Sequence, residues 1–149
     1  MTTPVYERDG IRFMYPENWT VDDQTQSQRL LCAVSLESPS GAIWTLNVEQ
    51  GHRDCEQLAG EVRRAMNEEY EDLESEPWQG VVAADFQAVG YELHFYCMEM
   101  VVKALVQCFH WDDRTVMLMT QAEARDHDEL APVFAAIATS LLAPPAEEG

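Results

Sequence analysis

Residues 90–122 read GYELHFYCMEMVVKALVQCFHWDDRTVMLMTQA, and the rest of the predicted fold is organised around them. Apolar and polar residues alternate at the start of this segment, so Leu93 and Phe95 share one face of a strand and polar neighbours occupy the other. Two further β-rich runs follow, from Val101 to Trp111 and from Arg114 to Ala122. The pattern predicts a three-strand antiparallel meander at the centre of a sheet.

Two turns set the predicted register of this meander. A first turn at Glu99-Met100 would place Tyr96 opposite Lys103 across the first hairpin. The second turn is expected at Asp112-Asp113, because short acidic side chains tolerate the left-handed backbone conformations that a two-residue hairpin needs.

Both faces of the meander carry large apolar side chains. The second turn places Met117 beside Cys108 on one face and Val116 beside Phe109 on the other. Because neither set can be left in water, the sheet needs cover on both sides. The sequence therefore predicts a three-layer sandwich rather than a sheet with one solvated face.

A first amphipathic helix follows Asp54, which forms a capping box with Gln57 in which each side chain satisfies a free amide of the other. Apolar residues then recur at helical spacing as far as Leu73. Pro77 prevents the helix from continuing, and an extended segment from Trp78 to Phe86 leads into the meander.

A second helix is predicted after the meander. We expect Asp126 or Asp128 to cap it, because Pro132 is tolerated only within a first helical turn. Its apolar residues recur at i, i+3, i+4, i+7 and i+11, and this stripe must pack on the sheet. The stripe consists of Leu130, Val133, Phe134, Ile137 and Leu141.

Four short strands are predicted before the first helix, at residues 11–15, 19–21, 30–36 and 42–48. Proline ends the first of them and presets the turn to the second. The polar segment 23–28 is expected to be a loop. No internal repeat or low-complexity segment interrupts the chain.

The first two of these strands and the turn between them read IRFMYPENW over residues 11–19, which resembles the F-x-Y-P-x-x-W motif of PsbP-like domains. This family includes the photosystem subunit PsbP, DcrB-type lipoproteins and a Ran-binding import factor. A strand at 117–120 and a helix at 133–141 fit the same pattern near the C-terminus. The motif residues have a structural role, since Tyr15 and Trp19 can cover one end of the core beside the proline turn.

The resemblance implies one α+β domain over residues 1–142, followed by a flexible acidic tail at 143–149. It implies a three-layer α/β/α sandwich around a mainly antiparallel sheet of about six to seven strands. It also implies a protein that binds or assembles rather than catalyses, because the family carries no shared catalytic residues that map onto this chain.

The charge of the chain excludes two classes of partner. There are 27 acidic residues against nine basic ones, which gives a net charge of −18. Such a chain repels phosphate backbones and anionic membranes, so we expect neither nucleic-acid nor membrane binding. The acidity is typical of a highly soluble protein, such as one from a saline cytoplasm, and a docking surface for a basic partner is the alternative.

The sequence also predicts the cellular location of the protein and the state of its cysteines. The N-terminus has no apolar leader and no run approaches the length of a membrane span, so we expect a cytoplasmic protein. The four cysteines form no CxxC pair and are interpreted as small buried hydrophobic residues rather than disulfides or metal ligands.

No local signature of catalysis occurs: there is no GxSxG, no glycine-rich loop before a helix and no HExxH. We therefore predict no cofactor and no metal. One polar set stands out, formed by Glu92, His94, Tyr96 and Lys103 on one sheet face. These groups could bind a small polar ligand or do acid-base work if they lined a cleft, whereas a solvated sheet end with ordinary ion pairs is the simpler interpretation.

Two functions follow from these patterns. The leading hypothesis is a non-enzymatic domain that binds another protein or forms a homodimer, through part of the sheet or its aromatic residues. The alternative is a small-molecule-binding or acid-base catalytic protein that uses the polar set. A group of four methionines, Met98, Met100, Met117 and Met119, could form a soft binding surface or fill gaps in the core.

Overall fold

The computed structural model describes residues 3–28, 30–83 and 85–143. These ranges contain β1 (Val5–Arg8), β2 (Ile11–Met14), β3 (Thr20–Asp23), α1 (Thr25–Gln28), β4 (Cys32–Glu37), β5 (Ile43–Gln50), α2 (Cys55–Glu69), β6 (Glu74–Val82), β7 (Phe86–Cys97), β8 (Met100–Trp111), β9 (Arg114–Glu123) and α3 (Ala124–Leu142). None of the helices described there is long and apolar enough to cross a membrane. Most of the predicted acidic tail, residues 144–149, lies outside the described residues.

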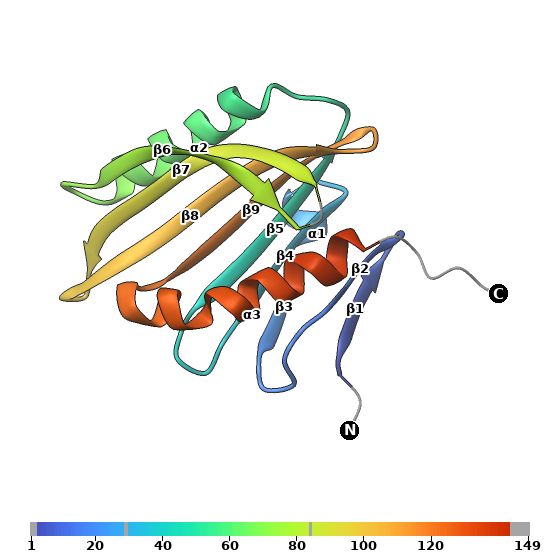
Figure 1. Ribbon diagram of the computed structural model, residues 1–149, viewed down its shortest axis with the longest axis horizontal. Helices are drawn as coiled ribbons and strands as arrows, with labels where there is room; N and C mark the ends of the chain where they lie inside the picture. The colour runs from blue at the N-terminus through green and yellow to red at the C-terminus, as the bar shows by residue number, and fades with distance from the viewer. Residues whose placement is uncertain (1–2, 29, 84, 144–149) are drawn as a thin grey trace.

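Seven strands form one antiparallel sheet in the order β3-β4-β5-β9-β8-β7-β6, and β1 pairs with β2 in a separate two-stranded sheet. Strands β3 to β5 make one meander and β6 to β9 another, and antiparallel pairing of β5 with β9 joins them. Helix α2 packs on β7, β8 and β9, while α3 crosses the opposite face and also contacts β2 (Figure 1). The α+β class and the three layers predicted from the sequence are confirmed.

The core beneath α2 is formed by apolar residues of the helix and of β7, β8 and β9. The helix begins as predicted, because the Asp54 carboxylate accepts a hydrogen bond from the Gln57 amide at 3.1 Å. On its inner face Ala59 and Met66 are buried against the alternate residues of β7, β8 and β9. At its C-terminal end, Tyr70 stacks on Phe95 with ring centroids 4.2 Å apart.

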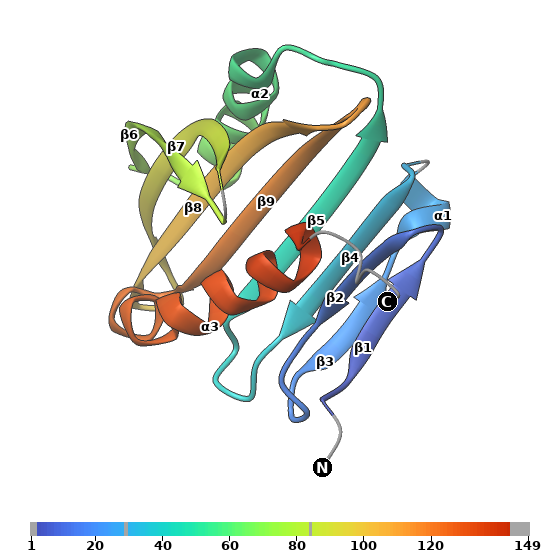
Figure 2. The ribbon, with the colours of Figure 1, turned by 45° about the vertical axis from the view of Figure 1, so that its right-hand side comes forward.

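The core beneath α3 is larger and rich in aromatic rings. The ring centroids of Phe13 of β2 and Trp44 of β5 lie 4.9 Å apart. Those of Trp19 and Phe134 of α3 lie 6.0 Å apart in an edge-on arrangement. The strand-turn-strand segment at residues 11–19 therefore closes one end of this core, as expected of its aromatic residues. The β1–β2 sheet lies alongside α3, as the second view shows (Figure 2).

The predicted register of the first hairpin was wrong. The turn consists of Met98 and Glu99, whose φ angles are 51° and 67°, so His94 lies opposite Lys103 and Tyr96 lies opposite Val101. A two-residue turn with left-handed residues matches the twist of the strands. The error amounts to two residues in the pairing, so each side chain keeps its predicted face. The register of the second hairpin, across Asp112-Asp113, is confirmed.

Helix α3 begins earlier than predicted. Glu123 is its N-cap and accepts a hydrogen bond from the Arg125 amide, whereas Asp126 and Asp128 were expected to cap it. The helix follows β9 without a loop. Pro132 consequently lies inside the helix and not in its first turn. It is exposed there, so the carbonyl left without an amide donor can bond to water.

Two elements at the N-terminal end had no predicted counterpart. Strand β1 is held by Tyr6, which stacks on Phe13 at 4.9 Å and donates a hydrogen bond to the Asp23 carboxylate at 2.6 Å. The other oxygen of Asp23 accepts from the Thr25 amide at 2.9 Å. Such a bond at a helix start explains why α1 replaces part of the expected loop.

Candidate functional site

The four predicted site residues lie on the sheet face that α3 covers. Glu92, His94 and Tyr96 follow one another along β7, and Lys103 of β8 is paired with His94. The structure thus brings the four onto one face, as the alternation along the strands predicted. Their order across the hairpin differs from the prediction, because Lys103 neighbours His94 rather than Tyr96.

Lys103 joins three elements by ion pairs. Its Nζ lies 3.4 Å from Glu92 Oε1 of β7 and 3.2 Å from Asp128 Oδ1 of α3. Burial by itself would lower the pKa of Lys103, but the hydrogen bond to Asp128 and the charge of Glu92 outweigh it and raise the pKa. The ammonium therefore stays charged at neutral pH. It fixes α3 to the sheet and is not available as a general base.

Tyr96 belongs to a different environment from the ion-paired residues. Its side chain is 70% exposed near the end of the β7–β8 hairpin, whereas Glu92 and Lys103 are largely covered. The four side chains therefore do not line one enclosed cleft. A binding role for Glu92, His94, Tyr96 and Lys103 stays a prediction.

The end of the β7–β8 hairpin exposes a group of large apolar side chains. We call this group the hairpin tip: Tyr96, Met98, Met100 and Val101, with exposed fractions of 70%, 86%, 48% and 42%. Single exposed apolar residues are common on protein surfaces, but a contiguous group is typical of an interaction site. The group of four methionines considered in the sequence is thereby divided, since Met117 and Met119 pack in the core beneath α2.

Charged groups surround the hairpin tip. Glu99 lies within the turn itself, between Met98 and Met100. Behind the tip, Glu123 is paired with Val102 at the end of β9, and the Asp128 side chain is 71% exposed. An apolar centre with a polar rim is the usual anatomy of a protein interface. Here the rim carries both charges, because Glu123 is ion-paired with Arg125 and Asp128 with Lys103.

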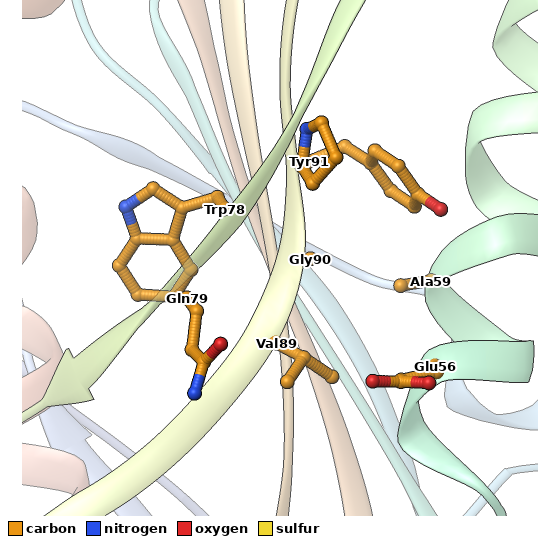
Figure 3. A pocket seen from close by; sticks show the side chains of 8 residues that line it. Glu56, Ala59, Trp78, Gln79, Val89, Gly90 and Tyr91 are labelled. Carbon is orange, nitrogen blue, oxygen red and sulfur yellow. The ribbon is translucent and has the colours of Figure 1, made fainter.

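A hollow of about 380 Å³ lies between α2 and strands β6 and β7 (Figure 3). Val89 and Tyr91 point toward α2, whereas Trp78 lies on the other side of the strands. Gly90 is required here, because a β-carbon would come within 1.6 Å of the Val106 carbonyl oxygen. Among the described residues that line the hollow, Glu56 is the only charged one, and these residues form no convergent polar set.

The sequence did not predict a stacked pair of histidines. The rings of His52 and His110 lie 4.3 Å apart with an interplanar angle of 9°. The Nε2 atom of His52 contacts the Asp112 carbonyl at 2.5 Å, and that of His110 contacts the Arg53 carbonyl at 2.7 Å. His52 therefore fixes the loop after β5 to the β8–β9 turn, and His110 fixes the same loop to β8. No group of potential metal ligands occurs among the residues that the structure describes.

No family model and no curated protein sequence matches this chain. Among solved structures, the chain is similar to cyanobacterial PsbP (CyanoP) from Synechocystis sp. PCC 6803, with a TM-score of 0.64 and 11% identity over 92% of this chain and 89% of that one. It is also similar to LpqN, involved in cell envelope biogenesis of Mycobacterium tuberculosis, with a TM-score of 0.55 and 10% identity over 92% and 87% of the two chains.

A third similar structure is PA94 from Pseudomonas aeruginosa, a protein of unknown function. Its TM-score is 0.51, with 11% identity over 97% of this chain and 99% of that one. At such low identity these likenesses concern the arrangement of helices and strands alone. The similarity predicted from the aromatic motif at residues 11–19 is confirmed at that level: the chain has the PsbP-like fold.

Proposed function

We propose that this protein is a non-enzymatic interaction domain that binds another protein through the hairpin tip. The observation that carries the proposal is the exposure of Tyr96, Met98, Met100 and Val101 at the end of one hairpin. Unbranched methionine side chains adapt to the shape of a partner, and tyrosine adds a rigid aromatic contact. The ion pairing of Lys103 within the fold is consistent with a role that involves no catalysis.

The partner is expected to present an apolar pocket with a cationic side chain at its edge. The tip projects from the sheet, so its complement must be concave, and Glu99 in the turn favours a cationic side chain beside the pocket. A second copy of this chain is disfavoured, because each copy carries a net charge of −18. The likeness in fold to CyanoP and LpqN supports an accessory role of this kind.

Site-specific photo-crosslinking in the source cells tests this proposal. A photoreactive residue replaces Met98 in one variant and Val81 in another, because Val81 is also exposed, at 57%, but lies at the end of β6. We expect one defined protein to be crosslinked from position 98 and not from position 81. Equal crosslinking from both positions would contradict a role for the tip.

The affinity for the crosslinked protein is then measured with purified components. The triple variant Tyr96→Ser, Met98→Ser, Met100→Ser should bind at least tenfold more weakly, and Val81→Ser should bind like the wild type. Light scattering should show a monomer. A dimer that the triple variant dissociates would indicate self-association instead.

A further inference from the structure

A second cavity, of about 230 Å³, lies between α3 and the sheet. Helix α3 crosses this face of the sheet diagonally (Figure 2). Its apolar lining comes from β5, β6, β8, β9 and α3, and its polar groups are Gln107, Thr120, His127 and Thr139. The apolar residues are Trp44, Val81, Val82, Ala83, Leu105, Leu118, Ala131, Phe134, Ala135 and Ala138.

His127 is the polar group that sets this cavity apart. Its side chain is buried, with 4% of the residue exposed, and Nε2 lies 2.9 Å from Thr120 Oγ1. The other ring nitrogen, Nδ1, is buried without a hydrogen-bond partner. Buried polar atoms almost always have a hydrogen-bond partner, and an unpaired one destabilises the folded state. A ligand in the cavity would relieve that cost by pairing with Nδ1.

The surroundings of the cavity favour an uncharged ligand. Among the described residues that line it, His127 is the only one with an acidic or basic side chain. The nearby ammonium of Lys103 is already paired with Glu92 and Asp128. Burial lowers the pKa of His127, and Lys103 lowers it further, so the imidazole is neutral at neutral pH. A charged ligand would lose its hydration without gaining a counter-ion.

Size and hydrogen bonding narrow the ligand further. An apolar cavity of about 150 Å³ accommodates benzene, so 230 Å³ accommodates one substituted ring. The rings of Trp44 and Phe134 suit an aromatic ligand. A hydroxyl group both donates and accepts, so it can pair with Nδ1 of His127 in either tautomer.

We propose that this cavity binds a small, uncharged phenol or aromatic alcohol, with its ring in the apolar part and its hydroxyl on Nδ1 of His127. This site is distinct from the hairpin tip and from the predicted set of Glu92, His94, Tyr96 and Lys103. It does not depend on the proposed interaction with a protein partner.

Titration calorimetry with p-cresol tests the site, with toluene as a ligand that lacks the hydroxyl. The full chain should bind p-cresol saturably with one site and bind toluene at least tenfold more weakly. His127→Phe keeps a ring of similar size, and this variant should lose the preference for p-cresol. Absence of saturable p-cresol binding to the wild type would overturn the proposal, as would an unchanged preference in the folded His127→Phe protein.

A second pair of variants keeps the proposal testable if His127→Phe does not fold. Ala135 is exposed on α3 and lines the cavity, so Ala135→Phe should obstruct it and reduce p-cresol affinity at least tenfold. Ala136 is also exposed but lines a different groove, so Ala136→Phe is the matched control. Nitrogen NMR of the His127 ring should show a shift of Nδ1 on p-cresol binding. Binding that is insensitive to Ala135→Phe, or that leaves Nδ1 unshifted, would contradict the proposed site.

Discussion

Strand β8 has a two-residue turn at each end, and the two turns differ in chemistry. At the Asp112-Asp113 turn, the Asp113 carbonyl accepts from the Gly51 amide at 2.7 Å and the Asp112 carbonyl contacts His52. At the Met98-Glu99 turn, by contrast, Met98 is 86% exposed. The first turn is fastened to the rest of the fold, and the second projects an apolar group into solvent. We infer that one end of β8 serves stability and the other serves binding.

The backbone supports the same distinction. Asp tolerates the left-handed region, and Asp112 adopts it with a φ of 56°. Met and Glu rarely do so, yet both residues of the other turn have positive φ. A turn residue chosen against its local preference is expected where function requires the side chain. The Met98-Glu99 turn meets that description.

The largest effect on stability is expected at the Asp112-Asp113 end of β8. Thr115 is fully buried, and its hydroxyl accepts from the Arg53 amide at 2.9 Å and donates to the Gly51 carbonyl at 2.6 Å. Thr115→Val should therefore destabilise the protein by about 1–2 kcal/mol, because two partly buried backbone groups lose their hydrogen-bond partner. Urea unfolding measures this. The matched exchange at the hairpin tip, Val101→Thr, should change stability by less than about 0.5 kcal/mol. A loss of stability as large as that of Thr115→Val would contradict the difference between the two ends of β8.

A smaller loss of stability is expected at Lys103, whose ion pairs hold α3 to the sheet near the hairpin tip. Lys103→Gln should lower the free energy of unfolding by about 1 kcal/mol, because the pairs with Glu92 and Asp128 are only partly covered. The difference from wild type should shrink in 1 M salt. Asp128→Asn should cost less than Lys103→Gln, since the Asp128 side chain is 71% exposed; the opposite order would contradict this assignment.

The tip can be made more stable at the expense of binding. Replacing Met98-Glu99 by Asn-Gly supplies residues that prefer positive φ, so stability should rise by about 0.5–1 kcal/mol. The same change removes Met98 from the tip and should weaken binding of the crosslinked partner. Thermal unfolding and calorimetry measure the two effects. A variant that binds as tightly as the wild type would show that Met98 does not contribute to the interface.

The smallest effect on stability is expected from mild acid, which protonates His127 of α3. The folded pKa of His127 is below its ordinary value because of burial and Lys103, while Asp128, Glu92 and His94 are the other titratable groups that act on it. The unfolded chain therefore binds a proton more readily, and stability should fall as pH drops below about 6.5. His127→Phe should flatten that part of the pH profile, and an unchanged profile would contradict the assignment.

Much of the fold could be predicted from local signals. Alternation along β7 to β9, the Asp112-Asp113 turn and the Asp54 cap each act over a few residues, and each is confirmed. The register error at Met98-Glu99 arose because neither residue signals a left-handed turn. It left the faces intact, because a shift of two residues preserves alternation.

The candidate sites depend on distant contacts, which local signals do not encode. The sequence leaves open whether each of the four methionines is on the surface or in the core, and only tertiary packing separates Met98 and Met100 from Met117 and Met119. Asp128 reaches Lys103, and His127 is buried, because α3 begins directly after β9. The sequence does not signal this helix start, since Glu123 is an unusual helix cap. Residues far apart in sequence, such as His52 and His110, meet only in the folded chain.

Hydrogen exchange of the protein bound to its crosslinked partner tests the central claim most directly. The claim is that the Met98-Glu99 end of β8 makes the interface and the Asp112-Asp113 end does not. We predict that the partner slows amide exchange at residues 96–101 and leaves residues 110–115 unchanged. Protection confined to residues 110–115, or no added protection at residues 96–101, would contradict the account.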